Sequence, residues 1–116
     1  MSPSEVKKET LKTLRQTRNA MMTAAWMDAL KKKSAEERQE AALKLLDVNS
    51  AMHELQNSVL ADIRDKLIAN EAALLNGIAG LGKALDNLNQ VKKVINSVGK
   101  VLDVVAKVVK FVATHV

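Results

Sequence analysis

The sequence predicts an all-α fold, either an elongated antiparallel helical hairpin or a three-helix bundle with coiled-coil-like packing. Apolar residues recur every three or four positions along most of the chain, which is the period of an amphipathic helix. One proline and four glycines among 116 residues leave few turns for a many-stranded sheet. This length predicts one domain, residues 1–116, with helices near 3–33, 35–76 and 78–115.

The first expected helix, 3–33, begins with a clear start signal. Ser2 can cap it, Pro3 suits the first helical position, and Glu5 completes a capping box. The lysines at 31–33 complement the negative end of the helix dipole. The Trp26 side chain is expected in the core rather than in a partner-binding surface. The expected apolar stripe contains Leu11, Leu14, Met22, Trp26 and Leu30.

The second expected helix, 35–76, starts at another capping box, Ser34 to Glu37. This signal favours a turn around Lys33 and Ser34, and a bent continuous helix is the alternative, because no glycine lies there. A regular heptad stripe follows, and Ile63 and Leu67 then interrupt it with a stutter that shifts the stripe. The stripe contains Leu45, Val48, Met52, Leu55 and Val59.

A glycine-rich stretch separates the second and third expected helices. Gly77, Gly80 and Gly82 lie within six residues, and each glycine weakens a helix interior by about 1 kcal/mol relative to alanine. A reversal is therefore expected here, which makes the three glycines a hinge or an apolar tip. The alternative is one very long helix, because the apolar period continues through the glycines.

The third expected helix, 78–115, carries the strongest pattern in the chain. Aliphatic residues recur every seven positions, and the apolar face is too wide for one neighbouring helix to cover. The expected helices of about 40 residues are roughly 60 Å long, and such a rod would bury its remaining strip by self-association. The pattern thus predicts a homo-oligomer, or a helical protein partner, with an assembly seam of Leu74, Leu81, Leu88, Ile95, Leu102 and Val109.

Charge is distributed in blocks. Residues 1–33 carry a net charge of +5, residues 34–76 carry −4, and residues 77–116 carry +4. The favoured interpretation is attraction between neighbouring helices. Nucleic-acid binding is not favoured, because aromatic residues for base stacking are nearly absent.

The sequence does not predict an enzyme. The two histidines, His53 and His115, lack a Glu-x-x-His partner, and the Asp62/Asp65 pair has adjacent cations. No phosphate-binding loop occurs, and without cysteine there is no thiolate ligand or thiol nucleophile. We therefore expect no catalytic residue, no cofactor and no metal.

A membrane-active protein is the alternative to an assembly protein. Lys93, Lys100, Lys107 and Lys110 lie opposite a broad aliphatic face, as in cationic amphipathic helices of the lipid-binding or pore-forming type. The N-terminus lacks the apolar run of a signal peptide. The longest uncharged stretch, residues 72–82, is far shorter than the roughly 20 residues of a spanning helix. A cytoplasmic location is the default expectation.

Overall fold

The computed structural model describes residues 1–111, which form an all-α fold and confirm the predicted class. The arrangement within that class differs from the expected hairpin or three-helix bundle, because each predicted long helix is divided. The described residues form six helices: α1 (Pro3–Ala20), α2 (Ala24–Lys31), α3 (Ala35–Asn57), α4 (Leu60–Ala69), α5 (Glu71–Ala84) and α6 (Val91–Val105).

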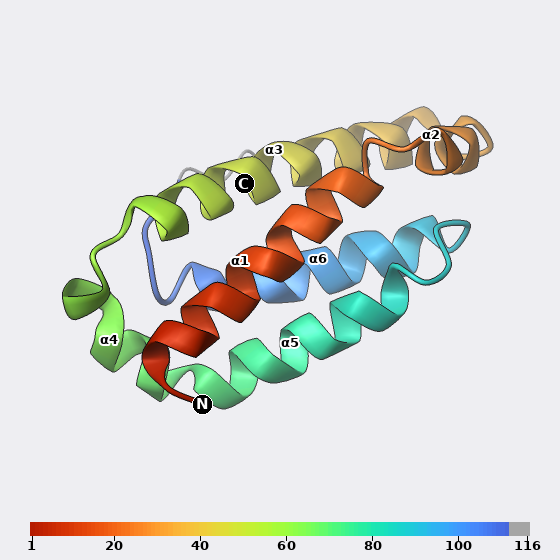
Figure 1. The fold of residues 1–116 in the computed structure, drawn as a ribbon. Coiled ribbons are helices and arrows are strands. Elements are labelled where there is room, and N and C mark those ends of the chain that lie inside the picture. Colours follow the sequence, from red (N-terminus) through yellow and green to blue (C-terminus); the bar gives the residue numbers. More distant parts are fainter. Residues whose placement is uncertain (112–116) are drawn as a thin grey trace.

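The helices form two layers (Figure 1). In one layer α6 lies between α3 and α5, and it runs parallel to α3 and antiparallel to α5. α1 crosses the front of this layer and packs on α3, α4 and α5, while α2 and α4 lie at opposite ends. The molecule measures 44 × 26 × 18 Å, so the expectation of a narrow rod with helices of about 60 Å is wrong.

α1 begins with the predicted capping box. The Ser2 hydroxyl accepts a hydrogen bond from the Glu5 N–H, and the Ser2 N–H donates to the Glu5 carboxylate at 3.1 Å. Hydrogen bonds from the Ser2 backbone and then from its side chain lower the pKa of Glu5. The buried face of α1 includes Thr10 and Thr17, whose hydroxyls each donate to the carbonyl four residues back at 2.8 Å. Those bonds allow threonine to occupy the core.

The predicted 3–33 helix is interrupted at residues 21–23, where sequence analysis expected none. Thr23 caps α2, because its hydroxyl accepts from the Trp26 N–H at 3.2 Å and donates to the Ala20 carbonyl at 2.7 Å. The break shifts the helical phase. As a result Met21 is buried, whereas Met22, which was expected in the stripe, is 63% exposed.

The predicted turn around Lys33 and Ser34 is present, and the Ser34 hydroxyl caps α3 by accepting from the Glu37 N–H at 3.1 Å. The predicted 35–76 helix is wrong, because α3 ends at Asn57. The Ser58 hydroxyl donates to the Leu55 carbonyl, and the Ser58 carbonyl accepts from the Lys7 ammonium at 2.7 Å. Val59, expected in the heptad stripe, follows this end and is 60% exposed.

A second break divides the same predicted helix at Asn70. This residue is both the C-cap of α4 and the N-cap of α5. The Asn70 side-chain amide donates to the Lys66 carbonyl at 2.8 Å. This bond satisfies a backbone carbonyl in the last turn of α4, at the point where the chain changes direction into α5.

The expected reversal at the glycines is wrong. Gly77, Gly80 and Gly82 all lie inside α5, and no described glycine has a positive φ. The chain reverses instead at residues 85–90, where the Asn87 side chain accepts from the Asn89 N–H at 3.1 Å. Asparagine stabilises turns in this way. The seven-residue pattern of the sequence continues across this turn, because Ala84 at the buried end of α5 and Val91 at the buried start of α6 are seven residues apart.

Two of the three glycines in α5 provide a direct test of its helical path. A Cβ at Gly80 or Gly82 would meet no heavy atom within 4 Å. We expect Gly80→Ala and Gly82→Ala each to stabilise the protein by about 1 kcal/mol, through helix propensity, and to raise Tm by a few degrees in circular dichroism melts.

Gly77→Ala serves as the contrast, because a Cβ there would lie 3.3 Å from the Val101 methyl Cγ2 of α6. Its gain in helix propensity is opposed by this crowding, so its Tm should rise less than that of Gly80→Ala. Destabilisation by Gly80→Ala would place a turn where the structure has a helix.

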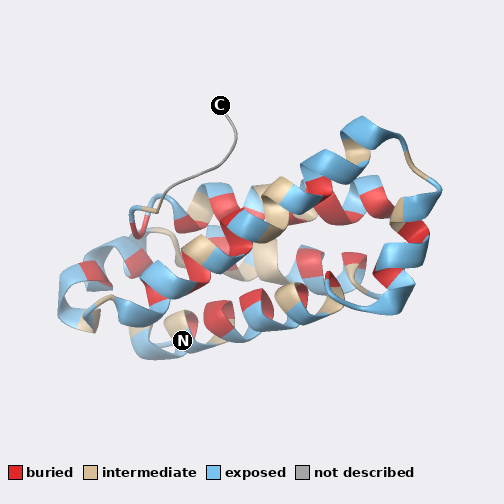
Figure 2. Cartoon of the chain, turned by 90° about the horizontal axis from the view of Figure 1, so that it is seen from above, coloured by how far each residue is buried: buried red, intermediate tan, exposed pale blue. Residues whose placement is uncertain are grey.

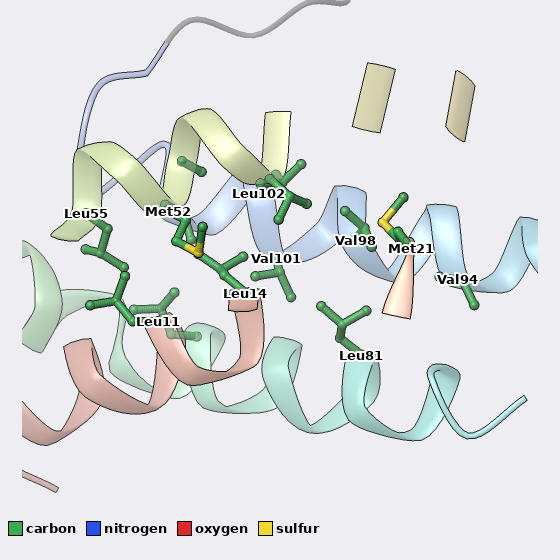
Figure 3. Close-up of a cluster of buried hydrophobic side chains, with 14 of the residues drawn as sticks. Leu11, Leu14, Met21, Met52, Leu55, Leu81, Val94, Val98, Val101 and Leu102 are labelled. Carbon is green, nitrogen blue, oxygen red and sulfur yellow. The ribbon is translucent and has the colours of Figure 1, made fainter. Parts of the chain in front are cut away.

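The core lies between the two layers, and buried residues occupy the inward sides of the helices (Figure 2). Leu14 of α1, Leu81 of α5 and Val101 of α6 converge in its centre together with side chains of α3 (Figure 3). α6 contributes the widest buried face of the six described helices: Val91, Val94, Ile95, Val98, Val101, Leu102 and Val105. α5, α3 and α2 pack against α6, and α1 crosses in front of this layer.

Candidate functional site: the outer face of α6

The residues of the predicted assembly seam lie inside a single chain. Leu74, Leu81, Ile95, Leu102 and Val109 are each less than 9% exposed, and Leu88 lies partly buried in the 85–90 turn. The seam therefore joins α5, α6 and their neighbours within one chain. A binding surface has to be sought among the exposed residues.

Five exposed lysines gather on the outer face of α6 and in the turn that follows it. The four predicted lipid-facing lysines, Lys93, Lys100, Lys107 and Lys110, are all exposed, as is Lys92. Asp103 is the single acidic residue among them. Because the valine-rich side of α6 faces the core, these lysines lie on the side of the layer away from α1. We call Lys92, Lys93 and Lys100 of α6, together with Lys107 and Lys110 in the segment just after its end, the α6 lysine face.

These lysines are not used by the fold. Among residues 1–111 the side-chain ion pair joins Lys31 to Asp28 at 3.5 Å, and the N-terminal amine lies 3.6 Å from Glu71. None of the five lysines makes a hydrogen bond or an ion pair with another described residue. Lys93 and Lys100 lie seven residues apart on α6, about 10 Å at 1.5 Å per residue, and Lys107 follows seven residues later, just after the end of the helix. The α6 lysine face is thus an extended row of available positive charge.

α1 carries a second basic surface on the opposite side of the molecule. Lys8, Lys12 and Arg15 are exposed there, beside a hollow of about 230 Å³. Glu5 and Glu9 lie on the same helix, and the Lys7 ammonium already binds the Ser58 carbonyl. The α1 surface thus offers three exposed cations on another helix, which serve as a matched control.

A groove separates α6 from α3. It consists of two hollows of about 330 and 220 Å³ that share Glu40 and Ile95. Ile95, only 2% exposed, forms part of the floor. The Lys44 ammonium extends from α3 over α6, 3.6 Å from where a Cβ on Gly99 would lie. The α3 wall carries Glu36, Glu37 and Glu40, and the α6 wall carries Lys92 and Lys100 with Asp103.

The candidate catalytic groups are dispersed. His53 is exposed on α3, where its ring contacts the Asn57 amide at 3.0 Å, and His115 lies outside the described residues. Asp62 and Asp65 are exposed on α4. Within residues 1–111 no three His, Asp or Glu side chains are placed to hold a metal ion. No described helix combines the length and apolarity needed to cross a membrane.

Comparison of the chain with family models, with curated proteins and with solved structures found no match.

The sequence pattern indicated the exposed lysines but missed two other features of the charged residues. It did not place the carboxylates of α3 beside α6, because the pairing of helices distant in sequence is not visible in a single helical pattern. It also missed Asp47, the one charged residue that is fully buried among residues 1–111. A lone aspartate within an amphipathic helix carries no signal that separates it from an exposed one.

Proposed function

We propose that this protein is a non-enzymatic interaction protein that binds anionic membrane surfaces through the α6 lysine face. The observation that carries the proposal is the row of five exposed lysines with no partner among the described residues. α6 would lie along the headgroups with its valines still packed in the core. Binding in this form requires neither a spanning helix nor release of the apolar face.

The affinity of the α6 lysine face for an anionic membrane can be estimated from its charge. Each lysine close to an anionic leaflet contributes about 1 kcal/mol, and the attraction decays within a Debye length. Three lysines at one surface therefore account for roughly 3 kcal/mol, or about a 100-fold difference in affinity. Such binding is reversible and strongly dependent on salt.

The test is co-sedimentation with phosphatidylserine-containing vesicles at low and high salt. The wild-type protein should bind at low salt and be released as salt screens the lysines. Replacing Lys93, Lys100 and Lys107 together by glutamine should weaken binding about 100-fold.

The matched control replaces Lys8, Lys12 and Arg15 by glutamine, which removes the same charge from the α1 surface. This triple variant should retain binding to within about tenfold, since its cations lie away from the membrane-facing side. If the two triple variants lost vesicle binding equally, the membrane would be attracting the net charge of the protein and not one particular face. Failure of the wild-type protein to bind at low salt would end the proposal.

Self-association, the leading sequence-based hypothesis, is the second candidate. The buried seam does not favour it, because assembly through Leu81 or Leu102 would require the chain to open. The groove between α3 and α6 does favour it, through a different set of residues.

A further inference from the structure

We propose that two copies of this chain pair through the groove between α3 and α6, with the acidic wall of each copy against the α6 lysine face of the other. The acidic wall is defined by Glu36, Glu37 and Glu40. This inference uses the same α6 lysine face as membrane binding, so the two contacts would compete for it, and it assigns an interface that the apolar seam does not supply.

The first support is that neighbouring charges of opposite sign remain unpaired within the chain. The acidic and basic blocks of the sequence become neighbours in the fold, since α3 packs beside α6. Yet no ion pair of 4 Å or less joins Glu36, Glu37 or Glu40 to Lys92 or Lys100. The attraction that the sequence suggested between these helices is therefore still available to a partner.

The second support is that the surface is complementary to itself. A twofold pair brings the same patch of both copies together, so that each contact occurs twice. With α3 and α6 parallel and adjacent, a twofold axis that runs along the groove places the acidic wall over the lysine face of the second copy. The helices of the two copies then run parallel, because a twofold axis across the groove would instead place acidic wall on acidic wall.

The third support is the shape and composition of the groove. Its two hollows share Glu40 and Ile95 in their linings, and charged side chains of both signs line them. A small apolar ligand finds little exposed apolar surface there, because Ile95 is 2% exposed. A charged helical surface of alternating sign, which a second copy presents, matches this lining.

The experiment is sedimentation equilibrium of two charge-reversal variants, alone and mixed. Glu36→Lys with Glu40→Lys makes both walls positive, and Lys92→Glu with Lys100→Glu and Lys107→Glu makes both walls negative. Each variant alone should dimerise at least about 100-fold more weakly than wild type at low salt, because like charges then face each other. An equimolar mixture should recover dimers, since the walls are again complementary.

The matched control is Glu9→Lys with Asp65→Lys, which changes net charge as much as the acidic-wall variant but on α1 and α4. It should dimerise like wild type to within a few-fold. Should a reversal variant lose its helical circular dichroism, Glu36→Gln with Glu40→Gln replaces it and should also weaken the dimer.

Three results would overturn the inference: a monomeric wild type at low salt, dimers that persist in both reversal variants, or a mixture that stays monomeric. The acidic-wall variant keeps every lysine of α6, so it separates this inference from membrane binding. It should bind vesicles at least as tightly as wild type while failing to dimerise.

Discussion

Leu102→Asp should unfold the protein at neutral pH. Leu102 is 3% exposed on α6, in the layer between α3 and α5. The substitution removes a buried apolar side chain and introduces a charge without a counter-charge, which costs several kcal/mol. That loss is comparable to the whole stability of a typical small domain, about 5–15 kcal/mol. Far-ultraviolet circular dichroism and urea titration should show loss of helix in the monomer.

Leu46→Asp provides the control, because it introduces the same residue at a leucine that is 52% exposed on α3. Its free energy of unfolding should stay within about 0.5 kcal/mol of wild type. The pair distinguishes a core position from an assembly position. If Leu102→Asp stayed a folded monomer and lost only its self-association, Leu102 would belong to an assembly surface and not to the core.

Trp26→Ala should cost about 3–5 kcal/mol, the usual range for deleting a buried aromatic side chain. Trp26 is 1% exposed and, with Ala29, forms the buried face of α2, which packs on α3 and α6. α2 has eight residues, and so short a helix is not stable without tertiary contacts. We therefore expect the midpoint of urea unfolding to fall and the α2 amides to lose protection from hydrogen exchange.

Met27→Ala is the matched control on the same helix, since Met27 is 46% exposed. It should leave both the unfolding midpoint and the exchange of α2 amides close to wild type. Similar losses for the two variants would mean that α2 packs on the core through another face.

The sequence predicted what depends on local chemistry. The caps at Ser2 and Ser34 were predicted because a serine hydroxyl satisfies a backbone N–H within its own turn. The valine-rich face of α6 was predicted because burial repeats with the helical period. The exposure of Lys93, Lys100, Lys107 and Lys110 followed from the same pattern.

The sequence misled where two local signals competed. The three glycines gave a stronger turn signal than the polar residues Asp86, Asn87 and Asn89. In the structure α5 stays helical through its glycines, and the Asn87 side chain stabilises the turn. The breaks at Thr23 and Asn70 were missed because both residues also occur within helices. The turn at 85–90 keeps the seven-residue spacing of apolar residues, so the pattern showed no interruption in the sequence. For this reason the core of one chain was predicted to be an assembly seam between chains.

The pairing of α3 with α6 could not be predicted from the sequence. Three charge blocks are compatible with several helix arrangements, and only the fold places the acidic wall beside the lysine face. The groove, and with it the proposed contact between copies, is therefore a property of the tertiary structure.

The central claim is that α6 buries its apolar face within its own chain and leaves its lysines for binding. One point of the core is surrounded by residues from α1, α3, α4, α5 and the α6 region: Thr10, Leu55, Leu67, Leu74, Val105 and Val108. The most direct measurement is an isotope-filtered methyl NOE experiment on a mixture of labelled and unlabelled protein. It should show contacts from Val105 and Val108 to Leu55, Leu67 and Leu74 within one molecule. Absence of these contacts, or their appearance only between molecules, would contradict the account.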